Sequence, residues 1–243
     1  MTATNHDNQS EPLEQSEALE LVSVHFAKSG GTSLWVGLKS AYGDAIFADH
    51  EHDPCNSSQR FNPVRKLPKS VRAVHGHIRP DLYPLDAETK LITFLREPAE
   101  KLLSSYYFWL NLPPCGSPEH DAFLTNRPDV FEYAEQVAGV AVSAYFAGFD
   151  MERFDLIGFH DRRVEHLARL SEMLGFSISS DIALNVTPFS PERHEIENDL
   201  AKMRRLRDIL KVNVEFYSDM RSRWLPRLEL RPERGSGRIA SAA

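Results

Sequence analysis

Short apolar runs alternate along this chain with segments whose apolar residues recur every three or four positions. Four runs have the length and composition of buried strands, at 19–26, 71–77, 91–96 and 154–159. Helical patterns cover about 32–42, 98–112, 130–147 and 162–174, and 190–220 forms one long helix or a broken pair. Buried strands alternating with amphipathic helices predict an α/β fold of three layers, in which a central parallel sheet is flanked by helices.

The remaining stretches show neither the apolar runs of strands nor the three-to-four-residue spacing of helices. Residues 1–17 are polar and acidic and predict a disordered leader, and 227–243 predict a flexible tail. Between them, 18–226 predict a single domain. Residues 44–70, which contain three prolines, and 113–129 are expected to be irregular and to shape a ligand pocket beside the sheet.

Composition is that of an ordinary globular protein, with 42% hydrophobic and 26% charged residues in 243. The net charge of -7 is no argument against an anionic ligand, because residues 1–20 hold five acids and no Lys or Arg. The rest of the chain carries about -2, which says little about a local anion site. With no basic excess and no recognition motif, nucleic acid is not expected as a partner.

The two cysteines, Cys55 and Cys115, lie far apart and have no metal-ligand spacing. Two free thiols in a reducing compartment are expected rather than a disulfide. The polar N-terminus is unlike a signal peptide, and no apolar run reaches the roughly 18 residues of a membrane span. The cytoplasm is therefore the expected location.

The first chemical signal is the segment AKSGGTS at 27–33, between the first strand and the first helix. Gly30 and Gly31 let backbone amides approach an anion, and the helix that follows presents free N–H groups and a positive dipole end. Lys28 adds a charge, and Thr32 and Ser33 add hydroxyl donors. The segment differs from a nucleoside-triphosphate loop, because the lysine precedes the glycines. An anion site and a flexible turn capped by Thr32 both fit these residues.

A second signal follows the third strand. Arg96 ends that strand and offers a forked donor suited to phosphate, and Ser104 lies off the packed face of the next helix. Alternatively, Arg96 pairs with Glu97 or Glu100 and Ser104 has no role.

Together the two segments AKSGGTS and FLREPAEKLLSSYYF resemble carbohydrate sulfotransferases of the heparan-sulfate 2-O-sulfotransferase type. The family motifs read roughly H-x-P-K-T-G-G-T-S and R-D-P-x-E-R-x-x-S-x-Y-Y. This chain departs from them at Ala27, Ser29, Glu97 and Lys101. FDLIGFHDR and VNVEFYSDM extend the resemblance over about residues 20–220, with Asn213 where an Asp is usual.

The resemblance implies a P-loop-like sulfotransferase fold and 3′-phosphoadenosine-5′-phosphosulfate (PAPS) as sulfo donor, with no metal required. It implies that the donor's 5′-phosphosulfate is held by Lys28, Ser29, Gly30, Gly31, Thr32 and Ser33. Arg96 and Ser104 would hold its 3′-phosphate. The acceptor would be a sugar-containing or other hydroxyl compound, which neither the fold nor the motifs identify.

The base candidate lies in VRAVHGH. His75 and His77 are two residues apart on a strand and so share a face. From the residues alone they are structural histidines, catalytic histidines or a His-x-His metal pair, although no third ligand has a suitable spacing. The family carries a similar His-Gly-His whose second His is taken as the base, which implies His77 as general base. Lys28 would stabilise charge on the leaving phosphate during in-line transfer.

Several weaker signals lie outside these motifs. DHEHD at 49–53 is interpreted as a solvated acidic segment rather than a metal cluster. The basic run from Lys202 to Lys211 is either a solvated helix face or an anion patch. Tyr107, Phe108 and Trp109 could stack on a sugar or pack in the core, and Asn185 and Thr187 could touch the adenosine.

Two other functions stay open at this point. A phosphotransferase would need a Gly-Lys-Ser/Thr loop and an acidic Mg²⁺ ligand at a strand end, and neither is evident. A nucleotide-binding module without catalysis would keep both anion sites and would have no use for His77.

Overall fold

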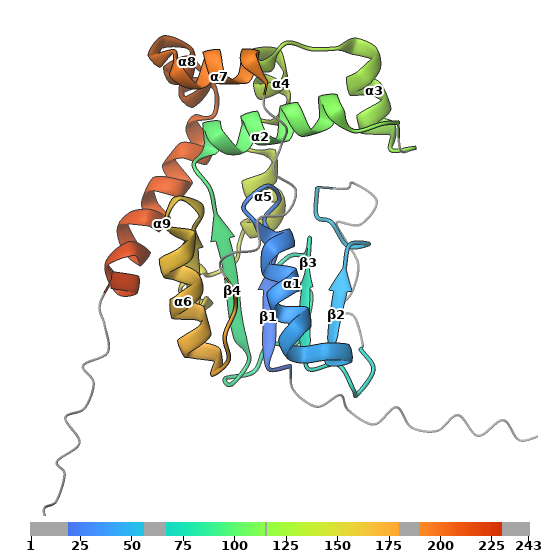
Figure 1. The fold of residues 1–243 in the computed structure, drawn as a ribbon, viewed down its shortest axis with the longest axis vertical. Helices are drawn as coiled ribbons and strands as arrows, with labels where there is room; N and C mark the ends of the chain where they lie inside the picture. Colours follow the sequence, from blue (N-terminus) through green and yellow to red (C-terminus); the bar gives the residue numbers. More distant parts are fainter. Residues whose placement is uncertain (1–18, 56–66, 115, 180–189, 230–243) are drawn as a thin grey trace, which may run out of the picture.

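A parallel sheet forms the centre of the molecule. The computed structural model describes residues 19–55, 67–114, 116–179 and 190–229. Within them, five strands lie parallel in the order β2-β3-β1-β4-β5 (Figure 1). Their bounds are β1 Leu21–Val24, β2 Ile46–Asp49, β3 Ala73–Gly76, β4 Lys90–Leu95 and β5 Leu156–Phe159. The chain leaves β1 toward one edge of the sheet and β4 toward the other, so the carboxyl ends of β1 and β4 form a switch point where α/β proteins bind ligands.

The four predicted strands are confirmed within a few residues, and the sheet contains a further strand that the sequence pattern did not predict. β2, Ile46–Asp49, lies within the segment 44–70 that was expected to be irregular. It is an edge strand of four residues that pairs only with β3 in the described sheet. Such a short run between polar and proline-containing segments gives too weak a period to be recognised.

The helices are α1 Gly31–Tyr42, α2 Pro98–Asn111, α3 Pro118–Asn126, α4 Val130–Val137, α5 Val140–Phe146, α6 Arg163–Leu174, α7 Pro191–Asn198, α8 Leu200–Ile209 and α9 Lys211–Glu229. Short 3-10 turns cover Gly43–Ala45, Met151–Arg153 and His160–Arg162.

Three helical predictions need correction. The helix expected over 130–147 is two, because Gly139 has a φ of 72° and starts α5 in a new direction. The last helical region is three helices, and Asp199 separates the first two by capping α8 with its carboxylate. The stretch 113–129 contains α3, which Ser117 caps and Pro118 begins.

The predicted three layers are confirmed. On one face of the sheet, α1 and α6 pack through Leu34, Leu38, Leu167 and Leu170 against Leu21 and its neighbours. On the other face, α5 and α9 contribute Tyr145, Phe146, Met220 and Trp224 to a core that includes Val22 and Val24. Adjacent β1 residues therefore face opposite layers, as a fully covered parallel sheet requires.

A helical cap lies beyond the carboxyl edge of the sheet. α2, α3, α4 and α8 share a separate core built from Leu103, Tyr106, Phe123, Tyr133 and Leu206. In Figure 1 these helices lie across the end to which the strand arrows point. The cap and the sheet edge thus face each other, and the residues that follow the strands lie between them.

The predicted domain limits stay predictions. The leader 1–17 lies outside the described residues, as do Asn185 and Thr187. At the other end, α9 continues through Glu229, three residues past the expected limit of 226. Among the described helices, none has the length and hydropathy that crossing a membrane requires.

Candidate active site

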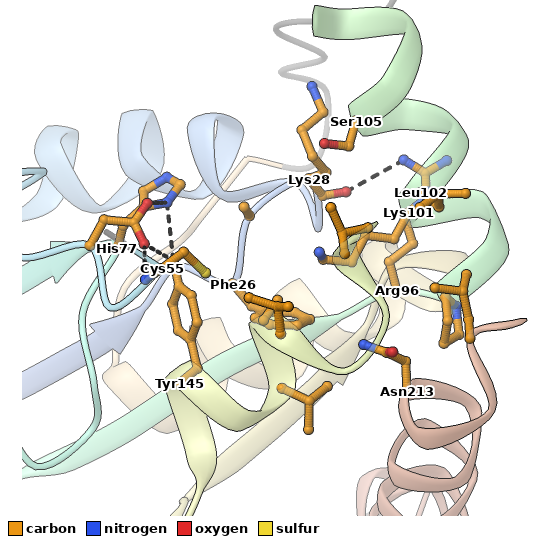
Figure 2. Close-up of a pocket in the computed structure, with 18 of the residues that line it drawn as sticks. Phe26, Lys28, Cys55, His77, Arg96, Lys101, Leu102, Ser105, Tyr145 and Asn213 are labelled. Atoms are coloured by element: carbon orange, nitrogen blue, oxygen red, sulfur yellow. Dashed lines mark hydrogen bonds and ion pairs between the residues drawn. The ribbon is translucent and has the colours of Figure 1, made fainter. Parts of the chain in front are cut away.

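Three predicted site residues meet where adjacent strands end. Val24 of β1 lies in register with Gly76 of β3 and with Thr93 of β4. His77 follows β3 and Arg96 follows β4, so both flank the loop that contains Lys28. Arg96 Nη1 donates to the Lys28 carbonyl oxygen at 3.5 Å. All three side chains line a cavity of about 580 Å³ between the sheet edge and the cap (Figure 2).

The loop after β1 has an unusual backbone. Gly30 has a φ of 90° and precedes α1, and Lys28 has a φ of 64°, which few residues other than glycine adopt. A Cβ on Gly31 would lie 2.0 Å from His25 Cδ2, so glycine is required there for close packing. Strained backbone at a strand-to-helix turn is typical of ligand sites. The predicted strand–loop–helix arrangement is confirmed.

Several groups in this loop suit an anion. The hydroxyl of Ser29 is buried and has no hydrogen-bond partner in the described part of the chain. The Lys28 ammonium lies 3.8 Å from the centre of the Phe108 ring and forms no ion pair with a described residue. Burial, reinforced by Arg96 and Arg193, lowers the pKa of Lys28 to about 8. An unsatisfied hydroxyl, an unpaired cation and a helix N-terminus together fit a phosphate or sulfate group.

Of the two residues predicted to hold the 3′-phosphate, Arg96 lines the cavity and Ser104 does not. Arg96 lines the cavity, and its Nε lies 3.4 Å from Glu100, so the predicted alternative pairing with Glu100 exists. Glu97 instead pairs with Arg207. Ser104 is buried in α2 and does not line this cavity, whereas Ser105 does. The assignment of Ser104 to a phosphate therefore stays a prediction.

Two further arginines lie near Arg96 and the loop after β1, and the sequence analysis did not single them out. Arg193 on α7 is close enough to lower the pKa of Arg96, after the larger effect of burial. Arg163 begins α6, and its Nε would lie 3.5 Å from a Cβ on Gly30. Burial, with Arg96 and Arg163 nearby, lowers the pKa of His160 to about 4. Arg163 and Arg193 come close to this region only because distant segments pack together, so no local sequence motif identifies them.

His77 is held by two neighbours. Its Nδ1 lies 3.3 Å from an Asp53 carboxylate oxygen and 3.1 Å from the Tyr145 hydroxyl. The Tyr145 hydroxyl also donates to Asp53 at 3.4 Å. Nε2 of His77 has no hydrogen-bond partner among the described residues. A carboxylate on Nδ1 fixes the tautomer with its proton there, which leaves Nε2 to accept a proton.

His75 has a structural environment. It is buried, and its Nδ1 lies 2.9 Å from the Ser23 hydroxyl on the neighbouring strand. Burial lowers its pKa to about 3, so it stays neutral. The ring of His25 lies between the two histidines, with ring centroids 5.2 Å from His75 and 4.4 Å from His77. His75 stacks on Trp35 of α1, whereas His77 lies just beyond β3 and contacts Tyr145 of α5, so the predicted common face stays a prediction.

The segment 49–53 is solvated only in part: His50 and Glu51 are exposed as the sequence predicted, whereas Asp49 is buried. Asp49 ends β2 and is 0% exposed, and its carboxylate is satisfied because Tyr83 and His52 donate to it at 2.5 and 2.8 Å. Asp53 reaches His77, and His50 lines the cavity. Burial alone would raise the pKa of Asp53, but hydrogen bonds from His77 and from the backbone N–H of Cys55 lower it below its usual value. The segment folds back because β2 pairs with β3 and places it beside His77.

The exposure of the side chains decides between the alternatives for the aromatic run 107–109 and the basic run 202–211. Tyr107 packs in the core of the cap, whereas Phe108 and Trp109 line the cavity, so only the latter two could stack on a ligand. The basic run is solvated, and three of its five charges form ion pairs: Lys202 with Glu195, Arg207 with Glu97 and Lys211 with Glu215. The interpretation as a solvated helix face is supported.

Asp49 is the strand-end acid that the sequence analysis did not find. It is fully buried, its carboxylate is satisfied, and it does not line the cavity, so it is poorly placed for a nucleotide-bound cation. Over the described ranges, no group of three or more His, Cys, Asp or Glu residues is arranged to hold a metal ion. Metal independence stays a prediction.

Comparison with known proteins gives distant likenesses only. No protein-family model matches the chain, and no curated protein matches it. Among solved structures, mouse sulfotransferase SULT7A1 in complex with PAP is 16% identical, with 84% of this chain and 90% of that chain covered and a TM-score of 0.39. A sulfotransferase from Alicyclobacillus acidocaldarius is 14% identical, with 80% and 96% covered and a TM-score of 0.40. At this distance the chemistry of the site rests on the residues of this chain.

Proposed function

We propose that this protein is a sulfotransferase that moves the sulfo group of PAPS to a hydroxyl of an acceptor. The observation that carries the proposal is the meeting of Lys28, Arg96 and His77 around one cavity. The first two serve a donor with two separate anionic groups, and the third serves an acceptor that must lose a proton. The motif resemblance supports the same assignment.

In the proposed reaction, Lys28 to Ser33 hold the 5′-phosphosulfate, and Arg96 and Ser104 hold the 3′-phosphate. His77 Nε2 takes the proton of the acceptor hydroxyl as its oxygen forms a bond to sulfur. The bond from sulfur to the 5′-phosphate oxygen breaks in line, and Lys28 stabilises the charge that develops on that oxygen. Asp53 stabilises the imidazolium that His77 becomes.

Arg163 and Arg193 add to the proposed donor site. Both bring positive charge toward Lys28 and Arg96 without a local motif. Several cations around one cavity are unfavourable in the free protein, because they repel one another, and become favourable when a polyanion binds. A donor with a phosphosulfate and a separate phosphate has the required charge.

The test is calorimetric titration with 3′-phosphoadenosine-5′-phosphate, the desulfated product, and with ADP as control, both without added metal. The bisphosphate should bind with micromolar affinity and ADP much more weakly. Lys28→Ala and Arg96→Ala should each weaken bisphosphate binding. Lys39→Ala, on the exposed face of α1, is the matched control and should leave it unchanged.

Equal affinity for both nucleotides would contradict the 3′-phosphate site and with it the sulfotransferase. Binding that requires Mg²⁺ would favour the phosphotransferase instead. Normal bisphosphate binding with turnover unaffected by loss of His77 would favour a nucleotide-binding module. The sugar-containing acceptor and the cytoplasmic location stay predictions.

A further inference from the structure

A second lysine lines the cavity and has no hydrogen-bond or ion-pair partner in the described part of the chain. Lys101 lies one turn into α2, and its ammonium is 4.5 Å from the centre of the Phe26 ring. Within the described residues it forms no hydrogen bond and no ion pair. Figure 2 shows Lys101 beside Phe26, with His77 and Tyr145 beyond them on one side and Asn213 on the other.

A cation in such a place is costly unless a counterion is available. Burial lowers the pKa of Lys101, and the nearby Cys55 and Asp53 offset this effect only in part. The ring of Phe26 adds a cation–π contact. The nearby acids are engaged elsewhere: Asp53 pairs with His77, Glu100 with Arg96, and Glu119 accepts from Ser117. The missing counterion is therefore expected on a ligand.

A chain of side-chain contacts leads from Lys101 to His77, the proposed general base. Phe26, which carries the ammonium on its face, packs edge-on against Tyr145 with ring centroids 5.3 Å apart. Tyr145 in turn contacts His77. A molecule lying along Phe26 and Tyr145 thus reaches Lys101 at one end and His77 at the other.

Asn213 adds a neutral donor to the same cavity. Its Oδ1 accepts the backbone N–H of Gly139 at 2.8 Å, which leaves the two amide N–H groups to donate. An Asp at this position, which the motif resemblance leads one to expect, would make the cavity more negative. The asparagine therefore suits an anionic ligand better than the aspartate would.

The walls indicate the body of that ligand. Phe108, Trp109, Val142 and Phe216 line the cavity and offer no hydrogen-bonding groups, apart from the Trp109 indole N–H. A sugar would lose several hydroxyl–water hydrogen bonds against such walls, whereas a flat apolar ring would not. The cavity of about 580 Å³ also contains Lys28 and Arg96, so the proposed donor takes part of it and the space that is left suits a compact acceptor.

We propose that Lys101 and Asn213 bind a carboxylate on the acceptor, and that the acceptor is a compact aromatic hydroxy acid. The proposal rests on the proposed sulfotransferase function and narrows its acceptor. The carboxylate would sit between the ammonium and the amide N–H groups, and the ring would lie in the cavity with its hydroxyl toward His77 Nε2.

The experiment measures binding of matched pairs of small molecules to the full chain, with and without saturating 3′-phosphoadenosine-5′-phosphate. The probes are 4-hydroxyphenyl acids with zero to three methylenes between ring and carboxylate, each paired with its amide. At least one acid should bind roughly tenfold or more tightly than its amide, as expected for a charge-assisted hydrogen bond. Lys101→Met and Asn213→Asp should remove this preference, and Lys101→Arg should keep part of it.

The control variant is Lys39→Met, which should keep the preference. Lys101→Met should bind the bisphosphate as the wild type does, and its Tm without ligand should be equal or higher, because an unpaired cation has left the cavity. Equal behaviour of every acid and its amide, absence of binding included, would overturn the proposal. So would a loss of bisphosphate affinity in Lys101→Met as large as in Lys28→Ala, since Lys101 would then be a donor contact. Failure of the wild type to bind the bisphosphate would instead refute the sulfotransferase.

Discussion

His77 and Asp53 face each other across the carboxyl edge of the sheet, with Nδ1 3.3 Å from the carboxylate. The two residues come from different connections, one directly after β3 and the other four residues after β2. Since β2 and β3 are paired in the sheet, the pairing of the strands brings the two side chains together. The base candidate is thus oriented by a residue that no motif marks.

Replacing Asp53 tests this relationship. Asp53→Asn keeps the shape but removes the charge that stabilises protonated His77, so turnover of PAPS with an acceptor found by screening should fall roughly tenfold or more. Affinity for the bisphosphate should stay unchanged, because Asp53 does not belong to the phosphate loop. Asp44→Asn, an exposed acid paired with Lys39, is the control. Unchanged turnover in Asp53→Asn would mean that the carboxylate does not assist His77.

A second prediction concerns Lys28 in catalysis. Lys28→Ala should lower turnover by roughly 10²–10³-fold at saturating PAPS, which is the usual effect of removing one preorganised donor to a developing charge. Lys39→Ala should not change it. A variant with weaker donor binding and normal turnover at saturation would limit Lys28 to ground-state binding.

The lowered pKa of Lys28 predicts that bisphosphate affinity depends on pH. Burial and neighbouring cations lower its pKa to about 8, so the free protein loses this charge as pH rises through 8. A bound phosphate favours the protonated form and raises the pKa in the complex, so binding takes up a proton above pH 8. Bisphosphate affinity should be flat from pH 7 to just below 8 and then fall with rising pH, by at most tenfold per unit for one proton. Lys28→Arg should bind with no such fall in calorimetry from pH 7 to 9.5, and a similar fall in that variant would assign the titration to another group.

Much of this arrangement could be predicted from the sequence. β1 and β4 are dense apolar runs, and residues that directly follow adjacent parallel strands must meet at one edge. His77 and Arg96 directly follow β3 and β4, Lys28 lies in the loop after β1, and the structure places all three around one cavity. β2 was missed because four residues, Ile46–Asp49, between polar neighbours carry too little period.

Missing β2 had a consequence for the site. Without that strand, no sequence feature predicted that Asp53 lies beside His77, and the segment 49–53 was interpreted as solvated. The sequence also could not predict that Arg193 lies near Arg96, because this depends on how α7 packs against α2 and not on any spacing in the sequence. That Lys101 lacks an ion-pair partner among the described residues likewise follows from the packing of the cavity. In each case a contact between distant segments decides the role of the residue.

The packing of Gly31 against His25 gives a prediction about stability. A Cβ on Gly31 would lie within 2.0 Å of the imidazole, so Gly31→Ala should lower the free energy of unfolding by about 1–3 kcal/mol. Denaturant unfolding of Gly31→Ala, His25→Ala and the double variant separates this clash from other effects. The double variant should be more stable than the sum of the single changes predicts. Strict additivity would show that the imidazole is not what the new methyl group meets.

Arg96 offers the sharpest test of donor recognition. Lysine at this position keeps the charge but loses the planar fork that can bind a phosphate with two hydrogen bonds and also reach the Lys28 carbonyl. Arg96→Lys should therefore lower the preference for the bisphosphate over ADP by roughly tenfold, mainly by weakening the bisphosphate. Arg72→Lys, in an exposed pair with Glu20 near the opposite edge of the sheet, controls for the same substitution away from the site. If the preference is retained in Arg96→Lys, the 3′-phosphate must be recognised by other groups, and Arg193 is then the residue to replace next.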